Sequence, residues 1–196
     1  MINMKDVSTK EHILIIAKGL FQKQGYAATG ITQILRAADI PKGSLYHFFP
    51  GGKEELLIES IKATTKENDA YLATLFQGIE PGFSRIYKLL EEVGSYDSYE
   101  GVVPFALIAL ETAESHEAIR EQCEQAYRYI LSRLAKEFEA EGMNSERAYQ
   151  LAGMIESSLE GALVFVHTFK DKAYIKTTVE NLARLIELEM SLLKND

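Results

Sequence analysis

The segment from Thr29 to Leu56 restricts the fold of this chain more than any other stretch, because two short helical patterns meet there at a tight turn. Apolar residues recur at helical spacing between Ile31 and Ala38. Pro41 then suits the first position of another helix, where its missing N–H would be unpaired in any case. The pattern predicts helix, turn and short helix, followed by a longer helix that begins at Lys53.

The second helix is too short to be stable alone, since isolated helices under about a dozen residues are marginal in water. We expect Leu45 and either Phe48 or Phe49 to anchor it in a small core. We also expect Thr29 to cap the helix before it. The outward residues could reach phosphates or base edges in a major groove. These candidate DNA contacts are Thr29, Thr32, Gln33, Lys42, Gly43, Ser44, Tyr46, His47 and Lys53. The same residues also suit a surface turn between two longer helices, so their chemistry alone leaves both interpretations open.

Three groups of residues follow one another in this segment: KGSLY at residues 42–46, then Phe49, then KEEL at residues 53–56. With the first helix, their order and spacing resemble the N-terminal signature of the TetR family of transcriptional regulators. Phe48 stands where the family usually has a phosphate-contacting histidine. Three residues separate Phe49 from Lys53, one more than usual, which resembles the LmrA-like branch associated with drug-resistance operons.

The resemblance implies an all-α fold of about nine helices, with a three-helix head that contains the helix-turn-helix and a larger helical body. We predict a DNA-binding head in residues 1–52 and a ligand-binding and dimerisation domain in residues 53–196. The composition also favours helix throughout, because Ala, Leu, Glu and Lys dominate and only four prolines occur.

Helical spacing and end signals place the other elements. Ser8 and Glu11 form a capping-box pattern ahead of the first helix, and Ser115 is expected to cap a long later one. The expected helices outside the helix-turn-helix span residues 9–24, 53–76, 83–93, 102–113, 115–141, 145–169 and 173–193. The irregular stretch at residues 94–101 reads as a loop that could lie over the mouth of a pocket.

The formal net charge of −8 at first argues against a nucleic-acid partner, because Lys and Arg supply most non-specific affinity for DNA. The charges are unevenly distributed, however. Residues 1–53 carry seven Lys or Arg against three acidic residues, whereas the remainder carries 14 against 26. A basic head on an acidic body can turn toward DNA while the body stays away from it.

The chain has a single cysteine, Cys123, which excludes an intramolecular disulfide and fits a reducing cytoplasm. His116 lies seven residues before it, but two ligands are too few for a closed zinc site, so we expect no metal and no cofactor. No apolar run approaches the roughly 20 residues of a membrane span. No catalytic motif is recognisable either, so we expect a cytoplasmic protein that is not an enzyme.

The last two predicted helices present more apolar surface than one domain needs, which favours a four-helix interface between two copies. Three small residues stand four apart on one helix, where a partner could approach closely. The candidate interface residues are Gly153, Ser157, Gly161, Leu182, Ile186 and Met190. Alternatively, both helices complete the core of a monomer.

Family resemblance implies an inducer site in the body, and aromatic and aliphatic residues with a few hydroxyls could line it. The candidates are Tyr87, Leu90, Phe105, Ile108, Tyr127, Met154 and Phe165. Each of them could instead be plain core. Glu111, Glu156 or Glu160 could pair with a cationic compound or simply face water.

We therefore predict a ligand-responsive repressor that binds a palindromic double-stranded DNA operator as a homodimer. A small, largely apolar or aromatic inducer would release it, and no membrane is involved. The alternative is a helical ligand-binding or scaffold protein whose degenerate head no longer reads DNA, which Phe48 keeps open. A helical enzyme would require a carboxylate or metal centre that the sequence does not mark.

Overall fold

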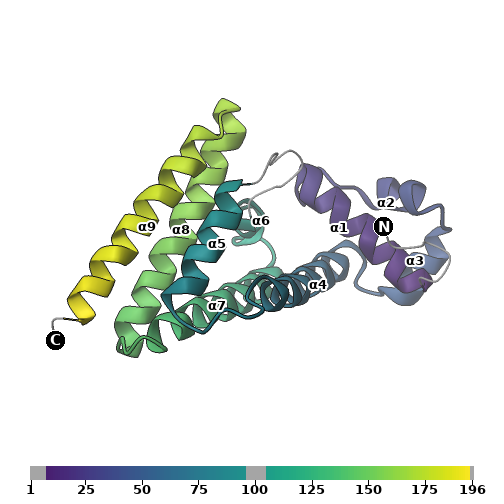
Figure 1. Cartoon of the computed structure of the whole chain (residues 1–196). Helices are drawn as coiled ribbons and strands as arrows, with labels where there is room; N and C mark the ends of the chain where they lie inside the picture. Colours follow the sequence, from purple (N-terminus) through teal and green to yellow (C-terminus); the bar gives the residue numbers. More distant parts are fainter. Residues whose placement is uncertain (1–7, 96–104, 195–196) are drawn as a thin grey trace. The chain divides into compact units, whose positions relative to one another are not determined.

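The computed structural model describes residues 8–95 and 105–194, and over these residues it contains nine α-helices and no strand (Figure 1). The all-α prediction is confirmed. The helices are α1 (Thr9–Gln24), α2 (Ile31–Ala38), α3 (Lys42–Phe48), α4 (Gly52–Leu75), α5 (Phe83–Ser95), α6 (Phe105–Thr112), α7 (Glu117–Glu139), α8 (Ser145–Phe169) and α9 (Ala173–Leu193).

The chain divides into two compact units. The first holds residues 1–67 and 101–126, and the second holds residues 68–100 and 127–196. α4 and α7 each pass from one unit into the other. The unit that contains the helix-turn-helix thus also includes α6 and the start of α7, while the predicted functional boundary between residues 52 and 53 stays a prediction.

The core of the first unit begins with α1, whose N-terminus is capped as predicted. The Ser8 hydroxyl accepts from the backbone N–H of Glu11 at 3.3 Å, and the Glu11 carboxylate accepts from the N–H of Ser8 at 3.1 Å. This reciprocal pair satisfies N–H groups that have no partner inside the helix. The buried stripe of α1 then packs with residues of α2, α3, α4, α6 and α7 in one cluster.

Several helix starts differ from the predictions by a residue or two. Gly30, rather than Thr29, is the N-cap of α2, and Pro41 lies at the N-cap of α3 rather than inside it. α4 already begins at Gly52, and α7 begins at Glu117 rather than directly after Ser115. Thr29 does not cap α2: Gly30 takes the N-cap position, and the Thr29 hydroxyl donates back to the carbonyl of Gly25 at 2.7 Å.

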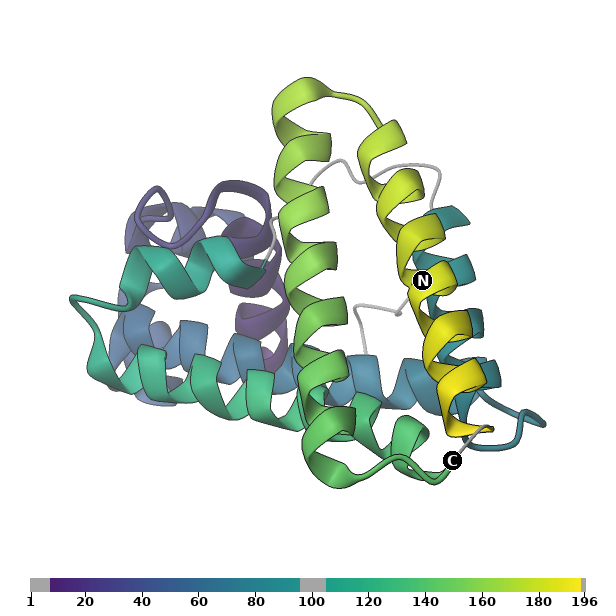
Figure 2. The ribbon, with the colours of Figure 1, turned by 90° about the vertical axis from the view of Figure 1, so that its left-hand side faces the viewer.

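In the second unit α9 packs along both α8 and α5, and these helices run side by side in both ribbon views (Figures 1 and 2). Their inner faces share a buried cluster with the second half of α7. Its largest fully buried side chains are Ile86, Leu90, Phe138 and Leu151. Burial of this apolar area is the main stabilising contribution to the second unit.

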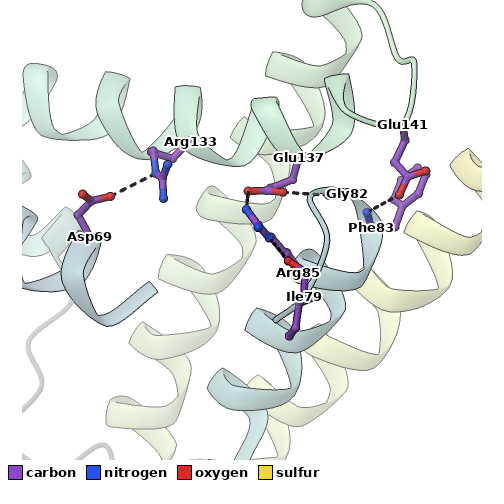
Figure 3. A network of polar contacts seen from close by, with 8 residues as sticks. All are labelled: Asp69, Ile79, Gly82, Phe83, Arg85, Arg133, Glu137 and Glu141. Atoms are coloured by element: carbon purple, nitrogen blue, oxygen red, sulfur yellow. Dashed lines mark hydrogen bonds and ion pairs between the residues drawn. The ribbon is translucent and has the colours of Figure 1, made fainter. Parts of the chain in front are cut away.

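Two carboxylates, one on α7 and one in the turn just after it, hold the N-terminus of α5, as Figure 3 shows. Glu137 accepts from the N–H of Gly82 at 2.9 Å, and Glu141 accepts from the N–H of Phe83 at 3.0 Å. Arg85 reaches Glu137 at 3.4 Å and also donates to the carbonyl of Ile79 at 2.8 Å. The first N–H groups of a helix lack intrahelical partners, and these carboxylates supply the missing acceptors. Their negative charges are also attracted to the positive end of the helix dipole.

The loop predicted at residues 94–101 begins later than expected, because Gly94 and Ser95 still belong to α5. The rest of that loop, and residues 102–104 of the following predicted helix, lie outside the described residues. No helix within the described ranges is long and apolar enough to cross a membrane.

Replacing Glu137 by Ala should lower the free energy of unfolding by about 2–4 kcal/mol, because it leaves a partly buried guanidinium and a helix N–H without their acceptor. Glu137 is 6% exposed, so water cannot readily replace its carboxylate. Urea denaturation of the purified variants measures the loss. The exposed Glu139 on the same helix supplies the control, and Glu139→Ala should change stability by less than about 0.5 kcal/mol. Equal effects of the two substitutions would contradict the structural role given to Glu137.

Candidate nucleic-acid interface

Two buried side chains hold the short helix α3 in place. Leu45 and Phe49 are fully buried in the core of the first unit. Phe48 is only partly buried and packs against the same core, so Phe49 is the deeper of the two aromatic candidates. The predicted anchoring by Leu45 is confirmed. Lys42, Gly43, Tyr46 and His47 are left exposed, with Ser44 partly exposed beside them.

The exposed face of α3 combines a cation with aromatic groups. The Lys42 ammonium lies 5.8 Å from the centroid of the Tyr46 ring, and Tyr46 is 41% exposed. His47 meets Phe48 edge to face at 4.9 Å between ring centroids. Such a face offers a phosphate-neutralising charge together with hydroxyl and imidazole groups that can bond to phosphates or base edges.

The turn after α3 explains the additional residue before Lys53. Gly52 is buried and has a φ of +63°, a conformation that costs other residues about 1 kcal/mol. A Cβ on Gly52 would lie 3.3 Å from Cε1 of Tyr46, so the Tyr46 ring packs closely over this glycine. The N–H of Gly51 donates to Glu55 at 2.8 Å and completes the turn. The extra glycine therefore helps to set the direction of Tyr46.

On α2 the predicted outward residues Thr32 and Gln33 are exposed. Gln33 exchanges hydrogen bonds with Gln24 of α1, at 2.8 Å and 3.1 Å, so its amide is held in place. Arg36, which lies in the last turn of α2, is also exposed and adds a cation that the predicted set of contacts left out.

Two of the predicted DNA contacts have other partners in the structure. Thr29 is fully buried, and its hydroxyl donates to the carbonyl of Gly25, so it stabilises the loop before α2 rather than facing solvent. Lys53 is partly buried, with its ammonium 4.0 Å from the centroid of the Tyr26 ring. Burial lowers the pKa of Lys53, and the carboxylate of Glu111 partly opposes that effect. A phosphate contact by Lys53 stays a prediction.

Comparison with known proteins decides which family has this arrangement. The profile described as "Bacterial regulatory proteins, tetR family" matches residues 13–59, and the one described as "Transcriptional regulator LmrA/YxaF-like, C-terminal domain" matches residues 82–181. The chain is 35% identical to the HTH-type transcriptional regulator YxaF of Bacillus subtilis, over 91% of this chain and 95% of that protein.

The chain belongs to the TetR family of transcriptional regulators.

A second relative is the HTH-type transcriptional regulator LmrA of Bacillus subtilis, 32% identical over 83% of this chain and 88% of that protein. Among solved structures, a TetR transcriptional regulator from Legionella pneumophila superimposes with a TM-score of 0.81 at 25% identity, covering 92% and 98% of the two chains. The predicted resemblance to the TetR family and its LmrA-like branch is confirmed. These relatives are transcriptional regulators and not enzymes, which sets aside the enzyme alternative.

TetR-family regulators usually bind small ligands, and the residues predicted for that role fall into both units. Phe105 and Ile108 belong to the core cluster of the first unit. Tyr87 and Leu90 belong to that of the second unit, where the Tyr87 hydroxyl lies 3.6 Å from the sulfur of Met190. On α8, Met154 and Phe165 are exposed. Ligand contact by any of these residues stays a prediction.

The second unit also places two carboxylates of α8 close together in a partly buried position. Burial and the neighbouring Glu160 raise the pKa of Glu156 to about 7. Tyr127 donates to Glu160 at 3.3 Å. Acidic residues on a helix usually face water, so this pair is the less expected arrangement and could recognise a polar group of a ligand.

The predicted dimer residues divide into two groups. Gly153 and Gly161 have nothing within 4 Å of the position where a Cβ would lie, and Ser157 is exposed, so this stripe of α8 is open. Leu182 and Ile186, in contrast, are buried within the protomer's own core, and Met190 packs partly against it. The exposed large apolar side chains of α9 are instead Tyr174, Leu188 and Leu192.

Cys123 and His116 both take part in packing within the first unit. Cys123 is buried in the first core cluster, and burial raises the pKa of its thiol to about 11, so little thiolate forms near neutral pH. The His116 ring meets Tyr26 edge to face at 5.0 Å. No group of three or more metal-ligating side chains occurs among the residues that the structure describes.

Lys42→Ala should weaken binding to DNA and reduce the slope of log K against log salt by about 1, because one phosphate contact is lost. The measurement is fluorescence anisotropy with a labelled duplex at several salt concentrations. Lys136 is exposed on α7 in the second unit, and Lys136→Ala removes the same charge. An unchanged slope for Lys42→Ala, or the same change for both variants, would show that Lys42 does not contact a phosphate.

Glu156→Gln should stabilise the protein by about 2 kcal/mol more at pH 8 than at pH 5, since one pKa unit corresponds to about 1.4 kcal/mol. The native carboxyl keeps its proton up to about pH 7, whereas the unfolded one ionises near its ordinary value of 4.5. Between these values the native state binds more protons and loses stability as the pH rises, and Gln removes that loss. Urea unfolding at both pH values tests this, with the exposed Glu180→Gln as control. A gain independent of pH would refute the raised pKa.

Proposed function

We propose that this TetR-family regulator is a ligand-responsive repressor that binds a palindromic operator as a homodimer. The observation that supports DNA reading most directly is the exposed face of α3, with Lys42 and Tyr46 outward and Leu45 and Phe49 fixed in the core. A helix anchored in this way can enter a major groove without losing its shape.

The dimer is supported by the open stripe of α8. A second helix could approach Gly153, Ser157 and Gly161 closely, because no side chain of the same protomer covers the two glycines. Phe165 continues the stripe, and it is 52% exposed. Exposed apolar residues beside small ones are typical of an interface between copies. A two-fold protein would place its two heads on half-sites about one helical turn or a little more apart.

The response to a ligand is supported by the second unit. The apolar side chains around Tyr87 suit a small, largely apolar or aromatic inducer. Separately, Tyr127, Glu156 and Glu160 offer hydrogen-bonding groups to a polar part of a ligand. Such a ligand would release the operator if it binds more tightly to the conformation that fits DNA poorly.

Selection from a random duplex library tests the operator, and the wild type should enrich an inverted repeat. Gly161→Gln should raise the dissociation constant of the dimer at least about tenfold, since the added side chain has room within the protomer but obstructs a partner. The monomer should then bind the inverted repeat at least about tenfold more weakly, because two linked heads bind more tightly than one.

Gly19 is the matched control, because it is an exposed helical glycine with equal space around it. Gly19→Gln should remain dimeric in light scattering coupled to gel filtration. A monomeric wild type, a dimeric Gly161→Gln variant, or a selected site without two-fold symmetry would count against the proposal.

A further inference from the structure

The loop between α1 and α2 is held by a carboxylate that lies far from it in sequence. Glu111 of α6 accepts hydrogen bonds from the backbone N–H of Tyr26 at 2.8 Å and of Ala27 at 2.7 Å, one on each oxygen. All three residues belong to the first unit. Glu111 is exposed, as one of its expected roles required, but both of its carboxylate oxygens are also used as acceptors for the loop.

The loop begins, close to Glu111, at a glycine whose backbone conformation other residues rarely adopt. Gly25 has a φ of +82°, and a Cβ there would lie 3.2 Å from Oε2 of Glu111. Tyr26 is 8% exposed and contacts the rings of Phe21 and His116, while Lys53 lies over its face. The loop is thus packed on one side and bonded to α6 on the other.

The same loop is tied to the helix-turn-helix. The Thr29 hydroxyl donates to the carbonyl of Gly25 at 2.7 Å, and the N–H of Thr29 donates to the carbonyl of Tyr26 at 3.1 Å. The Gln24 amide bonds to the carbonyl of Ala28 at 2.9 Å and to Gln33 of α2 at 2.8 Å. A displacement of the loop would therefore carry the start of α2 with it.

We infer that Glu111 is a positioning residue for DNA binding, whose carboxylate on α6 holds the α1–α2 loop and thereby fixes the helix-turn-helix in the orientation that reads DNA. The inference rests on the DNA-binding function and needs no effector. Two hydrogen bonds to an ionised acceptor are stronger than neutral ones. A loop that is already ordered also loses less conformational entropy when the protein binds DNA.

Glu111→Gln and Glu111→Ala test the inference. Gln keeps one carbonyl acceptor but turns an NH₂ group toward the other amide, whereas Ala removes both acceptors. We expect hydrogen exchange at the amides of Tyr26 and Ala27 to become about tenfold faster in Glu111→Ala, and to change less in Glu111→Gln. Affinity for the duplex selected by the wild type should fall in the same order, by about fivefold or more for Ala, while the thermal midpoint falls by no more than about 6 °C, so that the protein stays folded in the assay.

Glu114 provides a control of opposite expected sign. It is exposed just after α6, and Glu114→Gln removes the same negative charge. Loss of a negative charge by itself favours binding to a polyanion, so Glu114→Gln should bind the duplex equally or more tightly. The inference is overturned if Glu111→Gln behaves like Glu114→Gln, or if the two amides exchange at the wild-type rate. If the wild type selects no duplex, the proposed function fails separately, and amide exchange alone then decides whether Glu111 holds the loop.

Discussion

A seven-residue helix has almost no stability of its own, so the face that α3 presents depends on the burial of Leu45 and Phe49. These two side chains are buried in the core of the first unit, and Lys42 and Tyr46 remain exposed to solvent. Gly52 then permits a turn against which the Tyr46 ring can lie. The geometry of the reading face is thus imposed by the core and the turn rather than by helix propensity.

The core beneath α3 is built from segments that are distant in sequence. α6 and the start of α7 contribute Ile108, Ile119 and Cys123 to the same buried cluster as α1 and α3. Glu111 adds a polar connection from α6 to the loop before α2. The helix-turn-helix therefore shares its support with a helix outside the predicted head, and a change in α6 has a direct physical route to α2.

Much of this arrangement could be predicted from local sequence signals. The capping box at Ser8, the anchoring by Leu45 and the outward face of α3 depend on residues a few positions apart, and periodicity reports them. Thr29 was predicted wrongly as a cap because a hydroxyl at the start of a helix can bond forward or backward, and here it bonds back to Gly25. The role of Glu111 left no local signal, since its partners lie in another segment. Likewise, periodicity finds the buried stripe of α9 but not whether its own chain or a partner covers Leu182.

Photo-crosslinking tests most directly whether α3 is the element that reads DNA. A benzophenone amino acid in place of Tyr46 can be compared with the same group in place of Tyr71, because these tyrosines are 41% and 43% exposed and differ mainly in position. The account predicts a covalent adduct with the selected duplex from position 46 and none above background from position 71. No adduct at position 46 in a protein that binds DNA, or equal adducts at both positions, would contradict it.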